Sequence, residues 1–314
     1  QVTGTSAKAL TVTGGGAGDS IKASDDTTAG DTIKSGGGDD TINMHSALTY
    51  TDTIDGGAGT DTMQIASDIG DVAFMNVTNV ETLTINKTAT TAIDLGAYFS
   101  ATGITKVNLD TAVATVTATG ATQGITFVSS AAIDEVVTGG LGDDVFEIDG
   151  VLTNADTFVG GPGSDTLLLD NSGGAITLTA GMGAAGLSNT TGISGIEKIT
   201  FKDPDGGDTA GSEDSDNVSI TLDGESIAGI ATTNSTDDTD VLISIDGSVI
   251  TDSNDAVTVN VSDIGDPDYI FTITGGPGGD TLKGGGGADT IKGGAGIDGI
   301  EGNAGADTID GGAG

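Results

Sequence analysis

The sequence predicts an all-β protein, an elongated coil of short parallel strands with almost no helix. Glycine-rich nonapeptides recur in three separate parts of the 314-residue chain, and their aspartates keep a regular spacing. The stretches between them are rich in Thr, Val, Ile and Leu with the period-two alternation typical of strands. The helical period is almost absent, and only residues 93–99 are expected to form a helical turn or two.

The segment 275–314 contains four consecutive nonapeptides, GGPGGDTLK, GGGGADTIK, GGAGIDGIE and GNAGADTID. The sixth residue of each is Asp and the eighth is aliphatic. Six residues rich in glycine predict a tight turn, because glycine adopts positive φ at little cost. The next three residues predict a short strand whose eighth-position side chain points inward. Related nonapeptides occur at 14–22, 35–43, 56–64, 139–147 and 160–168.

The spacing of the aspartates predicts how the turns are arranged. Shorter Asp-Thr-x sequences begin at Asp31, Asp52 and Asp156, between the nonapeptides. In the N-terminal block the aspartates therefore follow one another at steps of 12, 9, 12 and 9 residues, whereas the C-terminal block steps by 9 throughout. A coil with two turns per circuit explains both patterns, with circuits of 21 and 18 residues respectively.

A looser motif recurs in the intervening stretches. Its copies are NVETLTI (79–85), GITKVNL (103–109), AIDEVVT (132–138) and GIEKITF (195–201). The steps of 24 and 29 residues between the first three copies predict successive rungs of a β-solenoid. The chain then divides into an N-terminal roll (1–64), a Thr/Val-rich solenoid segment (65–138), a central roll (139–168), a β-rich segment with acidic insertions (169–274) and a C-terminal roll (275–314).

Composition narrows the classes of function. The formal net charge is -38, with 40 Asp against 7 Glu, and all nine basic residues are Lys. Short acidic side chains suit tight turns, and so acidic a chain repels itself unless cations neutralise it. The charge argues against a nucleic-acid partner. There is no Cys and no apolar run long enough to span a membrane.

Stacked turns would bring two Asp carboxylates and several glycine carbonyls around one cavity. Flexible shells of hard oxygen ligands suit Ca²⁺ better than Mg²⁺, and Zn²⁺ fits poorly with no Cys and His45 as the one His. Multiple Ca²⁺ ions are therefore expected. The predicted carboxylate pairs are Asp19 with Asp40, Asp40 with Asp61, Asp31 with Asp52, Asp144 with Asp165, Asp280 with Asp298, and Asp289 with Asp307. The other predicted ligands are Asp156 and the glycines Gly56, Gly59, Gly139, Gly142, Gly160, Gly163, Gly275, Gly278, Gly284, Gly287, Gly293 and Gly296.

The pattern GGxGxDxUx, with U a large apolar residue, resembles the calcium-binding repeat of RTX proteins, and 275–310 matches it at nearly every position apart from Asn303. This resemblance implies a parallel β-roll with Ca²⁺ in its turns and export by a type I secretion channel to the cell exterior. Rolls interrupted by Thr-rich strands resemble calcium-dependent Gram-negative S-layer proteins, which implies a surface-layer subunit. The alternatives are the export module of an RTX toxin or hydrolase, and an adhesin segment.

No catalytic residue is predicted. His45 is interpreted as an ordinary loop residue, Arg is absent, and aromatic platforms for sugars are scarce. The acidic loop 203–216 is either a solvated insertion or a further Ca²⁺ site, and 237–238 and 263–268 have the same two interpretations. Expected partners are copies of the chain, joined through Ca²⁺, and a cell-surface polysaccharide or lipopolysaccharide anchor. The chain lacks an initiator Met and stops within a repeat, so we expect it to be a piece of a longer polypeptide whose roll continues.

Overall fold

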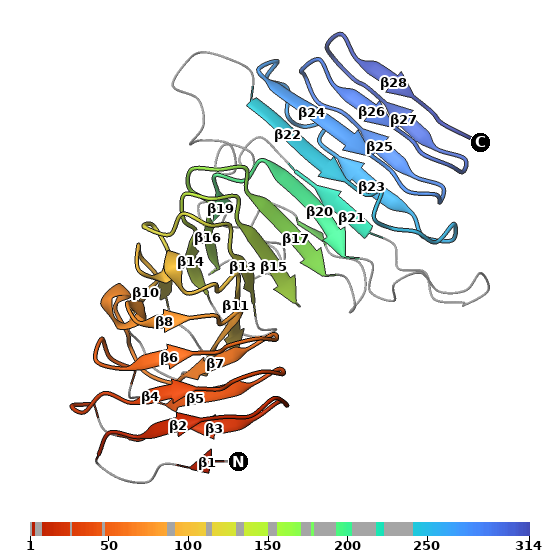
Figure 1. Cartoon of the computed structure of the whole chain (residues 1–314). Helices are drawn as coiled ribbons and strands as arrows, with labels where there is room; N and C mark the ends of the chain where they lie inside the picture. Colours follow the sequence, from red (N-terminus) through yellow and green to blue (C-terminus); the bar gives the residue numbers. More distant parts are fainter. Residues whose placement is uncertain are drawn as a thin grey trace. The chain divides into compact units, whose positions relative to one another are not determined.

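The computed structural model describes residues 2–3, 8–25, 27–45, 48–86, 92–110, 115–129, 135–149, 156–170, 177–178, 193–202, 218–222 and 241–314. The chain forms two compact units, Gln1–Val145 and Phe146–Gly314. In each unit, short strands pair in parallel and stack into rows (Figure 1), with very little helix. The predicted all-β coil is confirmed.

The first unit has one long row of strands and a second row on the other side of the coil. The long row runs β1 (Val2–Thr3), β3 (Ser20–Lys22), β5 (Thr41–His45), β7 (Thr62–Ile65), β9 (Thr82–Asn86), β11 (Lys106–Asp110) and β13 (Thr126–Val128). The opposite row is made by β2 (Thr11–Thr13), β4 (Thr32–Lys34), β6 (Thr53–Asp55) and β8 (Val77–Thr78), and then by β10 (Ala92–Asp94), β12 (Thr115–Thr117) and β14 (Val136–Thr138).

The second unit repeats this plan, and strand β15 (Val145–Asp149) begins at the boundary between the units. One row contains β17 (Thr166–Asp170), β20 (Lys198–Lys202), β22 (Val241–Asp246), β24 (Tyr269–Thr274), β26 (Thr290–Lys292) and β28 (Thr308–Asp310). The facing rows are β16 (Thr157–Val159) with β19 (Ile193–Ser194), and β18 (Thr177–Leu178), β21 (Val218–Thr221), β23 (Val257–Asn260), β25 (Thr281–Lys283) and β27 (Gly299–Glu301).

Strand register confirms the circuit lengths predicted from the aspartates. Thr41 pairs with Thr62, and Thr32 pairs with Thr53, so these circuits of the N-terminal roll have 21 residues. In the C-terminal roll Thr290 pairs with Thr308, which gives an 18-residue circuit. Consecutive turns therefore alternate between the two sides of the coil, and every second aspartate lies on the same side.

The core is built from ladders of apolar side chains, one from each of the three-residue strands and two from the longer ones such as β5 and β9. Ile42, Met63 and Leu83 stack in register and are fully buried. In the second unit the ladder runs through Leu167, Ile199, Ile245, Ile273, Ile291 and Ile309. Ile309, on the last strand, is 50% exposed, whereas Ile291 is fully buried. The eighth position of the repeat thus points inward, as predicted, because alternate side chains of a strand face opposite ways.

Two sequence predictions about the intervening segment need correction. AIDEVVT was expected to form the rung after GITKVNL, but β13 takes that place, with Lys106 paired to Thr126. The strand of AIDEVVT, β14, lies in the opposite row, where Val116 pairs with Val137. Two other strands, β12 and β13, come between the two motifs, so the third copy of the motif arrives on the other side of the coil.

The second correction concerns helix. Residues 93–99 were expected to turn, yet Ile93 continues strand β10, and the 3-10 helix η2 (Phe99–Ala101) begins only at Phe99. Another 3-10 helix, η1 (Asp71–Phe74), was not predicted. Phe74 and Phe99 meet edge to face at 5.1 Å and are both fully buried. Tertiary packing of the Phe74 and Phe99 rings against each other therefore stabilises these two helical turns.

Candidate metal sites in the stacked turns

The position-six aspartates form carboxylate ladders along the sides of the coil. In each ladder the backbone N–H of one Asp donates a hydrogen bond to Oδ1 of the Asp one circuit later. The distances are 2.6 Å from Asp19 to Asp40, 2.8 Å from Asp40 to Asp61, 2.7 Å from Asp31 to Asp52, and 3.0 Å both from Asp280 to Asp298 and from Asp289 to Asp307. Five of the six predicted pairs therefore come together, whereas Asp144 and Asp165 belong to different units and their pairing stays a prediction.

The nonapeptide turns adopt two backbone forms. In the closed turns the N–H of the second residue donates to Oδ2 of the turn's own aspartate. These bonds are Gly15 to Asp19 at 3.0 Å, Gly140 to Asp144 at 2.6 Å, Gly276 to Asp280 at 2.7 Å and Gly285 to Asp289 at 2.7 Å. In the open turns the second and fourth residues both have positive φ. These pairs are Gly36 and Gly38, Gly57 and Gly59, Gly161 and Gly163, Gly294 and Gly296, and Asn303 and Gly305.

Opening a turn leaves a carboxylate oxygen without a protein donor. Oδ2 atoms of Asp40, Asp61 and Asp298, all in open turns, are buried and accept no hydrogen bond. Burying an ionised oxygen without a partner is costly. Each of these atoms is therefore a position at which a cation would remove a cost that the protein itself leaves uncompensated.

Carbonyl oxygens of the next turn line the same positions. A Cβ added at Gly293 would lie against Asp298 Oδ2 and 2.7 Å from the carbonyl oxygen of Gly311. At Gly56 it would lie 2.7 Å from Asp61 Oδ2 and against the carbonyl oxygen of Asn79. Carboxylate and carbonyl oxygens therefore converge beside the first residue of the repeat, and this donor chemistry fits Ca²⁺.

In the longer turns on the other side of the N-terminal roll, the chain's own donors occupy the carboxylates, as they do in the closed short turns. Asp31 accepts from the N–H of Leu10 at 2.7 Å, and from the N–H and hydroxyl of Ser24 at 2.8 and 2.9 Å. Asp52 Oδ2 accepts from the N–H and hydroxyl of Thr49 at 2.7 and 3.1 Å. The geometry therefore favours cations at the carboxylate pairs of the short turns that include an open turn. The predicted cation at Asp31 and Asp52 took no account of the donors that Ser24 and Thr49 supply.

The remaining predicted aspartates also lie at the turns. Asp144 and Asp165 are fully buried, and Asp156 is 5% exposed. Asp307 follows the open turn at Asn303, whose φ is +67°. The acidic loop 203–216 and residues 237–238 lie outside the described residues, so their two interpretations both remain. In 263–268 the N–H of Asp268 donates to Asp266 Oδ1 at 3.1 Å, which is a local turn bond.

In the ion-free protein, burial raises the pKa of several carboxylates of the turns. Burial raises the pKa of Asp61, and repulsion from Asp40, Glu81 and Asp39 adds to the rise. Burial likewise raises the pKa of Asp144 from 3.8 to about 6, with Asp143 contributing repulsion. The pKa values of Asp280 and Asp289 rise for the same two reasons, burial first and then the neighbouring carboxylate of the ladder. A bound divalent cation would reverse this balance by favouring the ionised form.

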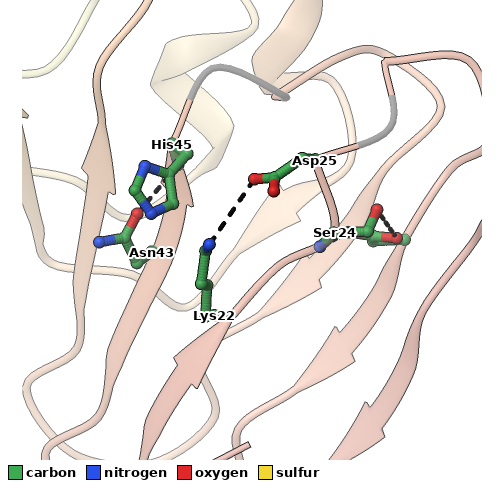
Figure 2. Close-up of polar contacts among 6 residues, drawn as sticks. Lys22, Ser24, Asp25, Asn43 and His45 are labelled. Carbon is green, nitrogen blue, oxygen red and sulfur yellow. Dashed lines mark hydrogen bonds and ion pairs between the residues drawn. The ribbon is translucent and has the colours of Figure 1, made fainter. Parts of the chain in front are cut away.

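His45 lies away from these ladders. It is the exposed last residue of β5, and its N–H donates to Asn43 Oδ1 at 3.0 Å. Figure 2 shows it beside Asn43, while Lys22 points toward Asp25 at 3.8 Å. Within the described ranges, no group of three or more His, Cys, Asp or Glu side chains is placed to hold a metal ion. The candidate sites therefore depend on backbone carbonyls as well as on paired carboxylates.

The open turns predict that their second residue tolerates no side chain in place of glycine when its φ is positive and a carbonyl oxygen lies against it. Gly57 has a φ of +95°, and an added Cβ would collide with the carbonyl oxygen of Gly36. Gly57→Ala is expected to lower the free energy of unfolding in calcium by about 1–2 kcal/mol or more. Gly16→Ala is the matched control, because no atom lies within 4 Å of its added Cβ and its φ is not positive. Chemical unfolding of both variants checks this, and equal losses would contradict the open-turn geometry.

The fold and these turns define a class, a parallel β-solenoid with stacked acidic turns suited to cations. Residues 47–64, 153–171, 272–300 and 295–314 match the family model of the RTX calcium-binding nonapeptide repeat (4 copies). These matches support an RTX repeat protein. RTX repeats bind Ca²⁺ in general, and proteins that carry them are generally secreted. The nonapeptides at 14–43 and 139–147 lie outside the matched ranges.

Searches of curated proteins and of solved structures returned no significant match. Among the described residues, no helix has the length and apolarity needed to cross a membrane.

Proposed function

We propose that this chain is a calcium-stabilised extracellular structural protein, a subunit of an S-layer or surface sheath that folds and assembles on binding Ca²⁺ after type I export. The observation that carries the proposal is the set of buried Oδ2 atoms of Asp40, Asp61 and Asp298 that lack a donor in the stacked turns. A cation between two turns would hold both carboxylates and join consecutive circuits. The ion supplies positive charge, and this chain's aspartates and carbonyls position it.

The cations are assigned to the short turns. The carboxylate pairs proposed to hold them are Asp19 with Asp40, Asp40 with Asp61, Asp280 with Asp298 and Asp289 with Asp307. Carbonyl oxygens beside the first residue of each repeat complete the sites, as for Gly311 next to Asp298. Binding of cations would then contribute directly to the free energy of folding, because these carboxylate pairs do not exist in the unfolded chain.

A structural role is supported by the way the rolls continue into the intervening strands. Register passes without interruption from Met63 in the nonapeptide to Leu83 and Val107 in the Thr/Val-rich segment. The result is a continuous ladder rather than a separate calcium-binding appendage. Assembly is proposed to involve Ca²⁺ between copies of this acidic chain, with a surface polysaccharide or lipopolysaccharide as the anchor.

Light scattering and electron microscopy test the proposal. The full chain is titrated with Ca²⁺ from chelator to about 10 mM, a range that covers the affinities of extracellular calcium modules. Growth into ordered sheets or tubes at millimolar Ca²⁺ is expected, with dissolution on adding chelator. A chain that folds but remains monomeric at every concentration would instead favour an export module or an adhesin segment.

A further inference from the structure

The carboxylate ladder of the N-terminal roll does not end with the last nonapeptide. Asp61 N–H donates to Glu81 Oε2 at 2.7 Å, as Asp40 N–H donates to Asp61 Oδ1 at 2.8 Å. Thr62 pairs with Thr82, so Glu81 occupies the position directly before the strand that Asp61 occupies one circuit earlier. Glu81 therefore continues the ladder although its turn lacks the glycine-rich sequence.

The space between these two turns has the features of the nonapeptide sites. Asp61 is fully buried, and its Oδ2 accepts no hydrogen bond. A Cβ added at Gly56 would meet this atom at 2.7 Å, together with the carbonyl oxygen of Asn79. Asn79 has a φ of +52°, a conformation like that of the glycines in open turns. The Asp61 carboxylate and the Asn79 carbonyl oxygen therefore border one position, and the Glu81 carboxylate lies close enough to Asp61 to bond its N–H and to raise its pKa.

The same arrangement recurs in the second unit. Asp165 N–H donates to Glu197 Oε2 at 2.8 Å. Gly195, with a φ of +64°, takes the place of Asn79, and its carbonyl oxygen and Asp165 Oδ2 both border the position of a Cβ at Gly160. The backbone bonds agree as well, since Glu197 N–H donates to the carbonyl of Asp165 at 3.0 Å, and Glu81 N–H to that of Asp61 at 3.2 Å.

The next circuit of the first unit shows where the ladder ends. Thr105 N–H donates to the carbonyl of Glu81 at 3.1 Å, so Thr105 stands one circuit after Glu81. Gly103, with a φ of +94°, takes the place of Asn79. The backbone shape persists, but the side chain at the ladder position is no longer a carboxylate. The run of ladder carboxylates that begins at Asp19 therefore ends at Glu81.

We propose that Asp61 and Glu81, with the carbonyl of Asn79, form a mixed aspartate–glutamate cation site that joins the N-terminal roll to the solenoid segment, and that Asp165 and Glu197 form its counterpart. This inference rests on the proposed calcium binding and extends it beyond the nonapeptide pairs. A divalent cation is the ligand, because each pair brings together two carboxylates and a carbonyl oxygen, which are hard oxygen donors. Its effect is to fasten the first non-repeat circuit to the roll.

Calcium counting tests the proposal with Glu81→Gln and Glu197→Gln. Glutamine keeps an oxygen that can accept the N–H of Asp61 or Asp165, and it removes only the charge. Bound Ca²⁺ is counted by equilibrium dialysis of the full chain, with Glu301→Gln as the control, because Glu301 is exposed and pairs with Lys283 at 3.2 Å. Each variant is expected to bind one ion fewer than the wild type, the double variant two fewer, and the control the same number.

Hydrogen exchange of β7 and β9 separates a cation site from a purely structural role. In saturating Ca²⁺, exchange in β7 and β9 should be faster in Glu81→Gln than in the wild type, while β26 and β28 keep the wild-type rates. If Glu81→Gln and Glu197→Gln bind as many ions as the wild type, this inference is wrong and the nonapeptide sites stand. If the wild type binds no calcium, the proposed function and this site fail together.

Discussion

Removing Ca²⁺ is expected to abolish most of the β-structure of the chain. Circular dichroism in chelator should show a largely unfolded spectrum, and Ca²⁺ should restore the β signal with a midpoint on the order of 10⁻⁴ to 10⁻³ M. This is the largest effect that we predict, because cation binding and folding are the same event when the sites do not exist in the open chain.

The size of the effect follows from mass action. At a free Ca²⁺ concentration about 20 times the dissociation constant, one site adds about 1.8 kcal/mol to the free energy of unfolding. Several such sites together contribute about as much as the 5–15 kcal/mol that stabilises a typical domain. The net charge of -38 acts in the opposite direction when the ions are absent, since the acidic groups repel one another.

Screening of this repulsion is the main alternative explanation for a salt-induced change. Mg²⁺ at the same concentration, and NaCl at the same ionic strength, are therefore the controls. Neither should restore the signal at the Ca²⁺ midpoint, because Mg²⁺ requires a stricter octahedral shell and keeps its waters. Equal recovery in all three salts would show that general screening, rather than site binding, folds the chain.

Asp40→Asn is expected to produce the second largest effect. Asparagine can still accept the N–H of Asp19 through Oδ1, but it replaces the buried, unpartnered Oδ2 by an amide and removes one charge from two neighbouring sites. The Ca²⁺ midpoint of folding should rise several-fold, and fewer ions should bind at saturation. Circular dichroism and equilibrium dialysis measure the two quantities.

Asp52→Asn is the matched comparison from the longer turns. Its Oδ2 accepts the N–H and hydroxyl of Thr49, so an amide in that place would face donors and weaken the turn by about 1–3 kcal/mol. The stability measured in denaturant should fall at every Ca²⁺ concentration that folds the chain, while the number of bound ions at saturation stays unchanged. Loss of ions in Asp52→Asn as large as in Asp40→Asn would show that both sides of the roll bind cations.

The sequence determined the coil, its circuit lengths and the inward ladder. The strands of the rolls are short because about three residues separate one turn from the next, and they are parallel because the chain coils in one direction. An aspartate every 9 or 12 residues determines which strands pair, as the pairing of Thr41 with Thr62 shows. The approximate position of the candidate sites follows from the same spacing. The place of β14 in the opposite row did not follow from the sequence. The looser motif contains no turn sequence that indicates how many strands lie between two of its copies.

Only the tertiary structure decided which nonapeptide turns are open. Glycine adopts positive and negative φ at similar cost, so nearly identical sequences do not choose between the two forms. Contact with the turn of the preceding circuit determines whether a turn is open or closed. Gly36 and Gly57 lie over the glycine carbonyls of an earlier nonapeptide turn and have positive φ, whereas Gly276 lies over the carbonyls of Gly247 and Ile250 and does not.

The same physical reason explains why Glu81 was missed. Its position in the ladder depends on the strand register between β7 and β9, which places it against Asp61, and the sequence around it contains no glycine-rich turn. Local composition determined that this chain forms stacked acidic turns. Contacts between circuits decided which carboxylate oxygens lack a protein donor. The N–H groups that could bond these oxygens lie either in another circuit of the coil or in a turn whose backbone the neighbouring turn has rotated.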